Sequence, residues 1–382
     1  MDLESSLVKL ADEIRAMDGQ REALGKALSS IKNDIVFPSG DSDIFEDRFV
    51  TKIIPHDLKK LKIGAVDGGI VQTKLHGMNL VVGRAVGVIF DFEAGRLFNT
   101  NYAPDAFPSV EVLPFNVPIS EREYGVSVSI NRQVMEMKRA REVVEKFSPE
   151  IMVLDGSVLP LAMDKPEKNS PAFAKYENLI GTYLDLYKSC ENKGAKLAGV
   201  IEDSSGERLT KLLREKIVPG IIKGREFEDW IIKELDDSKR ILEKTNDSNI
   251  IYYILDVGER TCIYSYSKDP VRHAVLQDLE NFSDRIYSFY LKTVPFDRPV
   301  RIDFVSGSTD RKIITKTANE IASAILALSM HNETYGFPSI MIEADARARL
   351  SENDLDMVYS RIKDKVGDLP SLFKLRRELR PF

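Results

Sequence analysis

The sequence predicts an α/β fold in which a mixed β-sheet carries helices on both faces. Three stretches indicate this class. Residues 62–102 alternate apolar runs with glycine-containing turns, a pattern typical of an antiparallel meander. Residues 121–147 repeat apolar side chains at the spacing of a long helix that covers a sheet. The remaining pattern is a strand at 151–154, a helix at 170–192, a strand at 196–201 and a helix at 207–216.

The first strand of the meander leads into an acid. Residues 63–66 are small or apolar and are followed directly by Asp67 and two glycines. Because sharp turns favour glycine, we expect the strand to end there, with the carboxylate held on a rigid element. The pattern recurs where residues 151–154 lead into Asp155 and a glycine. The alternative is that each Asp-Gly pair is only a hairpin turn.

Glu136 is predicted to face the protein body. It lies in line with Ala140, Val143 and Phe147, at offsets of four, seven and eleven residues along the same helix. A glutamate that faces a sheet is costly unless it is paired or bound to a cation. The alternative role of Glu136 is a salt bridge with an arginine or lysine at the flank of the helix.

The elements come in the order typical of the RNase H-like fold: a meander with an acid, a helix with an acid, and a strand that ends in an acid. Carboxylates that converge from three elements suit Mg²⁺ or Mn²⁺, because these hard cations prefer oxygen ligands. Two such ions would stabilise the attacking and the leaving oxygen of a phosphodiester. Asp67, Glu136 and Asp155 therefore predict hydrolysis of a nucleic-acid backbone.

Composition narrows the class of protein. The 382 residues carry a net charge of −6, so DNA would have to be held by local basic patches or by metal ions. Cys190 and Cys262 are the only cysteines and stand far apart, which fits a reducing cytoplasm and excludes a cysteine-built zinc site. No apolar run is long enough to cross a bilayer, and the first residues do not resemble a signal peptide. We expect a cytoplasmic protein with no membrane partner.

The domain organisation follows from shifts in pattern. Residues 1–36 are expected to form a coiled-coil-like helical extension, because leucines and isoleucines recur there at steps of three and four. We expect a kink or hairpin near Gly19, and packing either on a second subunit, as in a homodimer, or on the body of the chain. The other expected parts are a linker at 37–60, a nuclease domain at 61–366 with a helical insertion near 219–249, and a basic tail at 367–382.

The second half of the chain supplies candidate DNA contacts. Arginines there are predicted to line a phosphate track, since a guanidinium pairs with phosphate through two hydrogen bonds. The candidates are Arg260, Arg272, Arg298 and Arg301. The alternative is that they are ordinary solvated side chains. The elements expected in this half are β-rich runs at 250–266 and 300–305 and helices at 271–292, 309–331 and 352–366.

Six motifs together resemble the NurA nuclease family of archaea and some bacteria, over about residues 60–355. The resemblance implies an RNase H-like, Mn²⁺-dependent nuclease that acts from 5′ ends on single- and double-stranded DNA, with Asp67, Glu136 and Asp155 as metal-binding acids. It also implies a homodimer that docks on the hexameric ATPase HerA and resects DNA ends for recombinational repair. The motifs are AVDGG at Asp67, the helical Glu136, VLDGS at Asp155, LAGVIEDS at 197–204, DVGERT at 256–261 and FPSIMIEADARARLS at 337–351.

Three positions depart from the family pattern. Where the family has a Tyr and, eight residues on, a His, this sequence has Phe337 and Asp345, and Glu202 replaces a family Lys. A carboxylate can replace imidazole as a Mg²⁺ or Mn²⁺ ligand, so Asp345 is the fourth predicted metal ligand and catalytic residue. Its alternative role is an acid in the first turn of a helix, stabilised by the dipole. Two other functions stay open: a catalytically altered or inactive NurA-like adaptor, and an actin-like nucleotide-binding ATPase.

Overall fold

The computed structural model describes residues 2–37, 40–115, 120–224 and 227–376, and its contacts divide the chain into two compact units. Each unit is assembled from stretches that are distant in sequence. Unit 1 combines Met1–His56, Val200–Pro270 and Asp284–Pro338, and unit 2 combines Asp57–Gly199, Val271–Ser283 and Ser339–Phe382. The domain bounds expected from the sequence stay a prediction.

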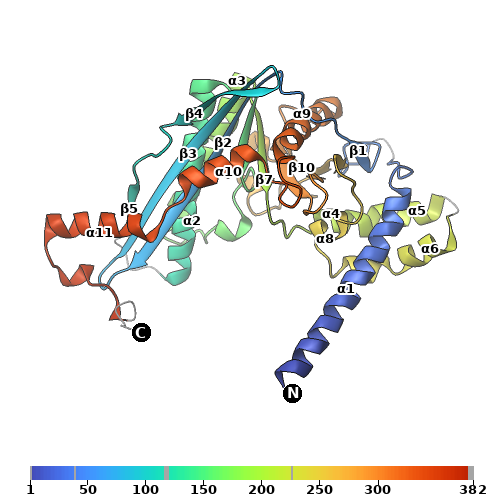
Figure 1. Cartoon of the computed structure of the whole chain (residues 1–382), viewed down its shortest axis with the longest axis horizontal. Helices are drawn as coiled ribbons and strands as arrows, with labels where there is room; N and C mark the ends of the chain where they lie inside the picture. The colour runs from blue at the N-terminus through green and yellow to red at the C-terminus, as the bar shows by residue number, and fades with distance from the viewer. Residues whose placement is uncertain (1, 38–39, 116–119, 225–226, 377–382) are drawn as a thin grey trace. The chain divides into compact units, whose positions relative to one another are not determined.

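Unit 2 contains a mixed sheet with the strand order β7-β6-β2-β3-β4, in which β5 also pairs with β3 (Figure 1). β2 and β3 pair antiparallel along all 15 residues of each strand, and β6 runs parallel to β2. The predicted meander and the two predicted later strands are therefore confirmed. The strands are β2 (Lys60–Lys74), β3 (Asn79–Glu93), β4 (Arg96–Ala103), β5 (Glu111–Phe115), β6 (Ile151–Asp155) and β7 (Lys196–Ile201), of which β7 belongs to this unit as far as Gly199.

Helices cover both faces of this sheet, as the predicted α/β class requires. α2 (Glu121–Phe147) and α10 (Ser339–Ala348) both pack on β2 and β3. They lie on opposite faces, because successive strand residues point to opposite sides: Gly68 lies against α2 and Gly69 against α10. α3 (Phe173–Lys193) packs on α2, and α11 (Glu352–Val366) follows α10.

The local sequence determines where α2 begins and ends. Ser120 and Glu123 form a reciprocal capping box at its N-terminus, and Ser148 adopts the left-handed conformation just before Pro149. Between these ends, Val143 and Val144 are completely buried. Since both ends and the apolar face are fixed, the side of the helix that carries Glu136 must face β2.

Unit 1 contains an antiparallel sheet in the order β1-β8-β10-β11, with β9 paired to β10. Its strands are β1 (Val50–Lys52), β8 (Glu259–Thr261), β9 (Tyr264–Ser265), β10 (Ile286–Leu291) and β11 (Val300–Val305). Its helices are α1 (Leu3–Ile31), α4 (Arg208–Leu212), α5 (Val218–Gly224), α6 (Asp229–Asp236), α7 (Ser238–Leu242), α8 (Asp247–Ile251) and α9 (Arg311–Ser329).

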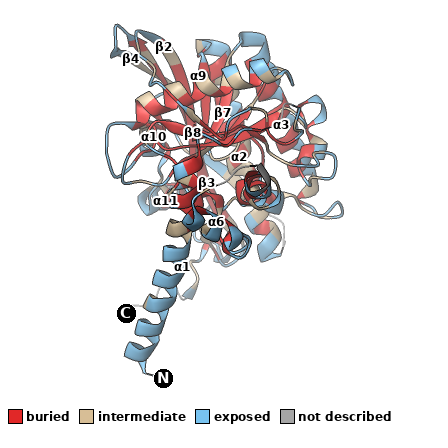
Figure 2. Ribbon diagram, turned by 90° about the vertical axis from the view of Figure 1, so that its right-hand side faces the viewer, coloured by how far each residue is buried: buried red, intermediate tan, exposed pale blue. Residues whose placement is uncertain are grey.

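α1 is one continuous helix, so the kink or hairpin predicted near Gly19 is wrong. A single glycine costs a helix only about 1 kcal/mol relative to alanine, which its helix-forming neighbours offset. The C-terminal part of α1 is buried in the core of unit 1 through Leu24 and Leu28, whereas its N-terminal part is exposed (Figure 2). Phe49, in the stretch predicted as a linker, is buried in the same core.

The helix predicted at residues 271–292 is absent, because that stretch forms two 3₁₀ turns and then β10. All six residues of β10 are buried, so the strand shows no alternation of polar and apolar side chains and resembles a buried helix in sequence. The run predicted as β-rich from residue 250 begins with the end of α8. The predicted helices at 309–331 and 352–366 are confirmed as α9 and α11. Within the described ranges, no helix is both long and apolar enough to span a membrane.

Candidate active site

Asp67 lies in the middle of β2 and not at its end. β2 continues to Lys74 in register with β3, so the sharp turn predicted after Asp67 is wrong. The two glycines serve close packing. A Cβ at Gly68 would stand 2.6 Å from Oε1 of Glu136, and a Cβ at Gly69 would overlap the carbonyl oxygen of Ala348. Glycine is therefore required here so that a helix can approach each face of the strand.

Glu136 faces the sheet from α2, as predicted, and only 4% of it is exposed. Its Oε1 accepts no hydrogen bond from any described residue, although Nη1 of Arg132 lies 3.3 Å away. Burial raises the pKa of Glu136 to about 8, with Asp67 and Asp155 adding to the effect and Arg132 opposing it. The alternative role, an ion pair with an arginine on the same helix, is thus present, but without a directed hydrogen bond.

Asp155 is the last residue of β6, the strand beside β2. The parallel register pairs Val66 with Leu154, which brings the next residues, Asp67 and Asp155, to the same level of the sheet. Asp155 is exposed, and its charge contributes to the raised pKa of Glu136. The charges of acids on β2 and β6 therefore act on Glu136, whereas their sharing of a cation stays a prediction.

Asp67 is buried on the face that α10 covers. Its Oδ1 accepts a hydrogen bond of 2.6 Å from the backbone N–H of Gly68. Burial raises its pKa, the Gly68 bond opposes this, and Asp345 on α10 raises the pKa further, whereas Arg132 and Arg349 lower it. The site therefore resists negative charge on Asp67 although two arginines are near.

Asp345 is a partly exposed acid on the rim of this cluster. It lies in the second half of α10, not in its first turn, so stabilisation by the N-terminal helix dipole does not account for it. Arg349 pairs with it at 2.8 Å, with the two side chains 74% and 54% exposed. The charge of Asp345 therefore acts on Asp67, while about half of the Asp345 side chain is exposed to solvent.

The four acids fit a divalent cation in chemistry. As their side chains are placed, no group of three or more His, Cys, Asp or Glu among the described residues is close enough to hold a metal ion. Two observations nevertheless favour a cation. Among the described residues, no donor is hydrogen-bonded to the buried Oε1 of Glu136. Burial raises the pKa values of Glu136 and Asp67, and the nearby arginines oppose this without reversing it. Carboxylate oxygens are the donors that Mg²⁺ and Mn²⁺ prefer.

The arginines predicted to contact DNA lie in different surroundings. Arg260 is fully buried, and it donates to both carboxylate oxygens of Glu46 at 2.5 and 2.6 Å. The side chain of Arg301 is 12% exposed and pairs with Asp303 at 2.8 Å. Both guanidinium groups are committed to partners inside unit 1, which does not fit a surface phosphate track. Arg272 is exposed and stays a candidate.

The residues that depart from the family motif differ in burial. Phe337 is buried just before α10, with its ring centroid 6.1 Å from that of Tyr335, whereas Glu202 is exposed just after β7. The Phe337 side chain, unlike the Tyr of the family, has no polar atom that would need a hydrogen-bond partner when buried.

Two arginines at the acid cluster were missed by sequence reasoning. Arg132 precedes Glu136 by four residues, and Arg349 follows Asp345 by four. That spacing places side chains on the same side of a helix and was the available signal. The same spacing is so common among surface ion pairs that it did not single these two out.

The mixed sheet with helices on both faces, which carries acids on β2, β6 and the two covering helices, defines an RNase H-like fold. The chain belongs to the NurA family, because the NurA domain model matches residues 61–350. The crystal structure of the NurA nuclease from Sulfolobus solfataricus matches with a TM-score of 0.57 and 14% identity, over 96% of this chain and 98% of that one.

Two other solved structures resemble the chain more weakly. A NurA crystal structure has a TM-score of 0.44 and 12% identity, over 97% of this chain and all 100% of that chain. A NurA structure bound to dAMP and manganese has a TM-score of 0.38 and 13% identity, over 91% and 93%. A search of curated proteins found no match.

Proposed function

We propose that this chain is a divalent-metal-dependent DNA nuclease whose metal ligands are Asp67, Glu136 and Asp155, with Asp345 as a fourth acid. The observation that carries the proposal is the buried Oε1 of Glu136, which has no hydrogen-bond donor among the described residues and lies against Gly68, beside Asp67. Membership of the NurA family over residues 61–350 supports it. The cations are Mn²⁺ or Mg²⁺, bound as two ions.

Bound cations of this kind stabilise charge on the attacking and leaving oxygens of a phosphodiester. The chain's own contribution is to position the donors. Asp67 is fixed on a fully paired strand and Glu136 on a capped helix, and both are buried. Asp155 and Asp345 are more exposed, so they mark the side from which a DNA strand approaches. A carboxyl must lose its proton before it binds a cation, so the raised pKa of Glu136 predicts metal binding that strengthens as the pH rises towards about 8.

We further propose the cellular role that the resemblance implies. The protein acts as a 5′-end-directed exonuclease, with endonuclease activity on single strands, in DNA end resection for recombinational repair. It works in the cytoplasm as a homodimer together with a HerA-type hexameric ATPase. The exposed Leu3, Leu7 and Ile14 of α1, which are four and seven residues apart, support self-association. Sedimentation that finds only monomer at micromolar concentration would remove the homodimer.

The nuclease proposal is tested with end-labelled linear DNA, Mn²⁺ or Mg²⁺, and three proteins. Wild type should shorten the DNA only when the cation is present, and Asp67→Ala should lose essentially all of this activity. The matched control is Asp91→Asn, because Asp91 is an acid of the neighbouring strand β3 that pairs with Lys62 at 3.5 Å instead of joining the cluster. Its activity should be unchanged. Cation-dependent cleavage that survives in Asp67→Ala would contradict the assignment of the site.

The inactive adaptor is the second candidate, favoured by the pairing of Asp345 with Arg349 and by Phe337 in place of a family Tyr. It predicts binding to a HerA-type ATPase without DNA cleavage under any cation. The actin-like ATPase is disfavoured. β2 continues as a paired strand past Gly68 and Gly69, so no turn follows Asp67 that could wrap around phosphates.

A further inference from the structure

Arg132 is the cation closest to the buried part of the acid cluster. It lies one helical turn before Glu136 on α2, with Nη1 3.3 Å from Glu136 Oε1. Its charge also acts on Asp155 and Asp67, and these three acids together raise the pKa of Arg132. The charge of one guanidinium therefore acts on acids from three different elements of the fold.

The ion pair between Arg132 and Glu136 is loose. The distance is that of an ion pair, but the N–H groups are not directed at Oε1, which remains without a hydrogen bond among described residues. Arg260 in unit 1 shows the opposite arrangement, since it donates to both oxygens of Glu46 at 2.5 and 2.6 Å and is fully buried. Two directed bonds hold Arg260 in place, whereas the side chain of Arg132 is 40% exposed and can turn towards solvent.

We propose that Arg132 is a displaceable counter-cation: it partly compensates the negative charge of Asp67, Glu136 and Asp155 in the metal-free protein and leaves them when a divalent cation binds. This inference rests on the proposed metal site. A divalent cation carries twice the charge of Arg132 and is coordinated directly by carboxylate oxygens, so at sufficient concentration it displaces Arg132 from the acids. Arg132 thereby sets the cation concentration at which the site fills, and it keeps the acid cluster stable before that point.

The second arginine of the cluster does not take this role. Arg349 pairs with Asp345, and its side chain is 74% exposed, so water already screens its charge. Its effect reaches Asp67 but is not among the causes that shift the pKa of Glu136. Of these two arginines, only Arg132 acts on Glu136.

The test measures Mn²⁺ affinity by calorimetry and the melting temperature in EDTA and in Mn²⁺, without DNA. Arg132→Gln should bind Mn²⁺ roughly tenfold more tightly than wild type, the change that corresponds to about 1.4 kcal/mol. It should also melt at a lower temperature in EDTA, because the negative charge of the three acids is then less compensated. Arg132→Lys keeps the charge and should bind within about threefold of wild type, roughly half that free energy. Arg141→Gln is the matched control on the same helix, since Arg141 pairs with Glu145 and Asp185 at 2.7 and 2.8 Å; it should change neither quantity.

A second measurement uses the wild-type protein and so does not depend on how the variants fold. The side-chain ¹⁵Nε NMR signal of Arg132, assigned with Arg132→Lys, should shift and sharpen when Mg²⁺ is added, while that of Arg141 stays constant. Two results would overturn the inference about Arg132 and leave the proposed nuclease site standing. One is an Arg132 signal that does not change while Mg²⁺ binds. The other is an Arg132→Gln protein that binds Mn²⁺ no more tightly than wild type. A wild-type protein that binds neither Mn²⁺ nor Mg²⁺ overturns the proposed nuclease site as well.

Discussion

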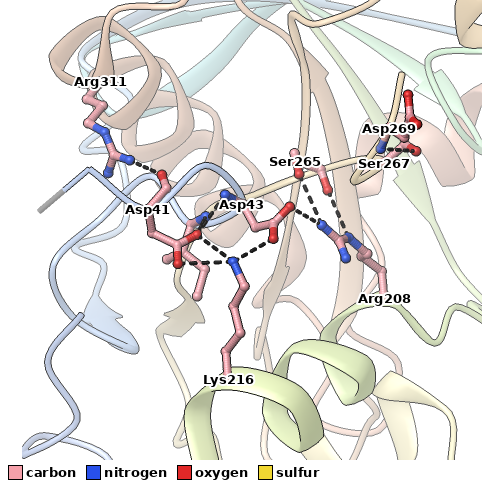
Figure 3. A network of polar contacts seen from close by, with 9 residues as sticks. Asp41, Asp43, Arg208, Lys216, Ser265, Ser267, Asp269 and Arg311 are labelled. Carbon is pink, nitrogen blue, oxygen red and sulfur yellow. Dashed lines mark hydrogen bonds and ion pairs between the residues drawn. The ribbon is translucent and has the colours of Figure 1, made fainter. Parts of the chain in front are cut away.

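Two clusters of carboxylates, one in each unit, have pKa values that are shifted in opposite directions. In unit 1, Asp43 pairs with Lys216 and Arg208, both at 2.6 Å, and Asp41 accepts bonds from Lys216 and from two backbone N–H groups (Figure 3). Burial alone would raise the pKa of Asp41 and of Asp43, yet the cations and hydrogen bonds lower both pKa values. In unit 2, burial raises the pKa of Asp67 and of Glu136, and the nearby arginines do not reverse it.

The two clusters differ in the supply of partners. Asp43 and Asp67 are 3% and 7% exposed, but Asp43 forms two ion pairs at 2.6 Å, whereas Asp67 accepts a hydrogen bond from the backbone of Gly68. A carboxylate whose charge is fully compensated within the chain is a structural group. One that remains under-compensated is a candidate to bind something positive. The following predictions test this distinction, from the largest expected effect to the smallest.

In metal-free buffer, the two clusters should make the free energy of unfolding depend on pH in opposite ways. The pKa of Glu136 rises from 4.5 to about 8 on folding, so between these values the folded chain holds a proton that the unfolded chain has released. Raising the pH through this window should therefore lower the free energy of unfolding, by roughly 4 kcal/mol in total. The lowered pKa values of Asp41 and Asp43 act the other way, because their contribution is lost only as the pH falls through the acid range.

Urea unfolding in EDTA at several pH values measures this effect. Glu136→Gln removes the titrating group and should flatten the loss of stability above pH 5, whereas Mn²⁺ should restore stability to the wild-type protein at pH 8. Equal slopes for wild type and Glu136→Gln would show that Glu136 does not titrate in this window.

Removal of Lys216 should convert the balanced cluster into an under-compensated one. Among the described residues, Lys216→Met leaves Arg208 as the cation paired with Asp43, whose side chain is 4% exposed, and leaves backbone N–H groups as the donors to Asp41. Breaking a buried ion pair from one side costs about 3 kcal/mol of unfolding free energy, measured by urea denaturation at pH 7. Lys211→Met is the control, since Lys211 is half exposed and pairs with the exposed Glu207 at 3.4 Å; its effect should be negligible. A similar stability for both variants would mean that the cluster is not held by its cations.

The acid cluster of unit 2 should be sensitive to the backbone that brings its elements together. Gly69→Ala places a methyl group on the carbonyl oxygen of Ala348, so α10 must move away from β2, at about 2 kcal/mol of stability. Displacement of α10 should also weaken Mn²⁺ binding, because Asp345 moves with it. Gly125→Ala is the matched control. Gly125 lies on α2, and a Cβ there would have no neighbouring atom within 4 Å. Because alanine is the better helix former, this variant should be slightly more stable than wild type. Tight Mn²⁺ binding by Gly69→Ala would exclude Asp345 as a ligand.

Sequence periodicity predicted α2, β6 and the first part of β2, but it did not predict α10, which carries Asp345. The bounds of α2 agree with the prediction because a long amphipathic pattern ends in clear capping residues, and the same pattern correctly turned Glu136 towards the sheet. The position of Asp67 was predicted less well. Glycine serves both sharp turns and close packing, and only the helices across the chain decide between the two.

The surroundings of the arginines depended on contacts distant in sequence. Arg260 meets Glu46, which is 214 positions away, so nothing near Arg260 in the sequence indicates that it is buried. β10 was mistaken for a helix because burial on both faces removed the alternation that identifies a strand. These errors share one cause, since burial is a property of the assembled unit.

The smallest effect on stability is expected at Arg349. Its ion pair with Asp345 is largely exposed, so Arg349→Ala should change the free energy of unfolding by less than about 0.5 kcal/mol. If Asp345 is a metal ligand, loss of this partner should still strengthen Mn²⁺ binding by roughly twofold to threefold, less than the change at Arg132, because a screened charge competes weakly. Calorimetry on Arg349→Ala, Arg132→Gln and the double variant compares the two effects directly. Additive effects would indicate two independent counter-cations, whereas an equal or larger effect at Arg349 would mean that burial does not decide how strongly an arginine competes for these acids.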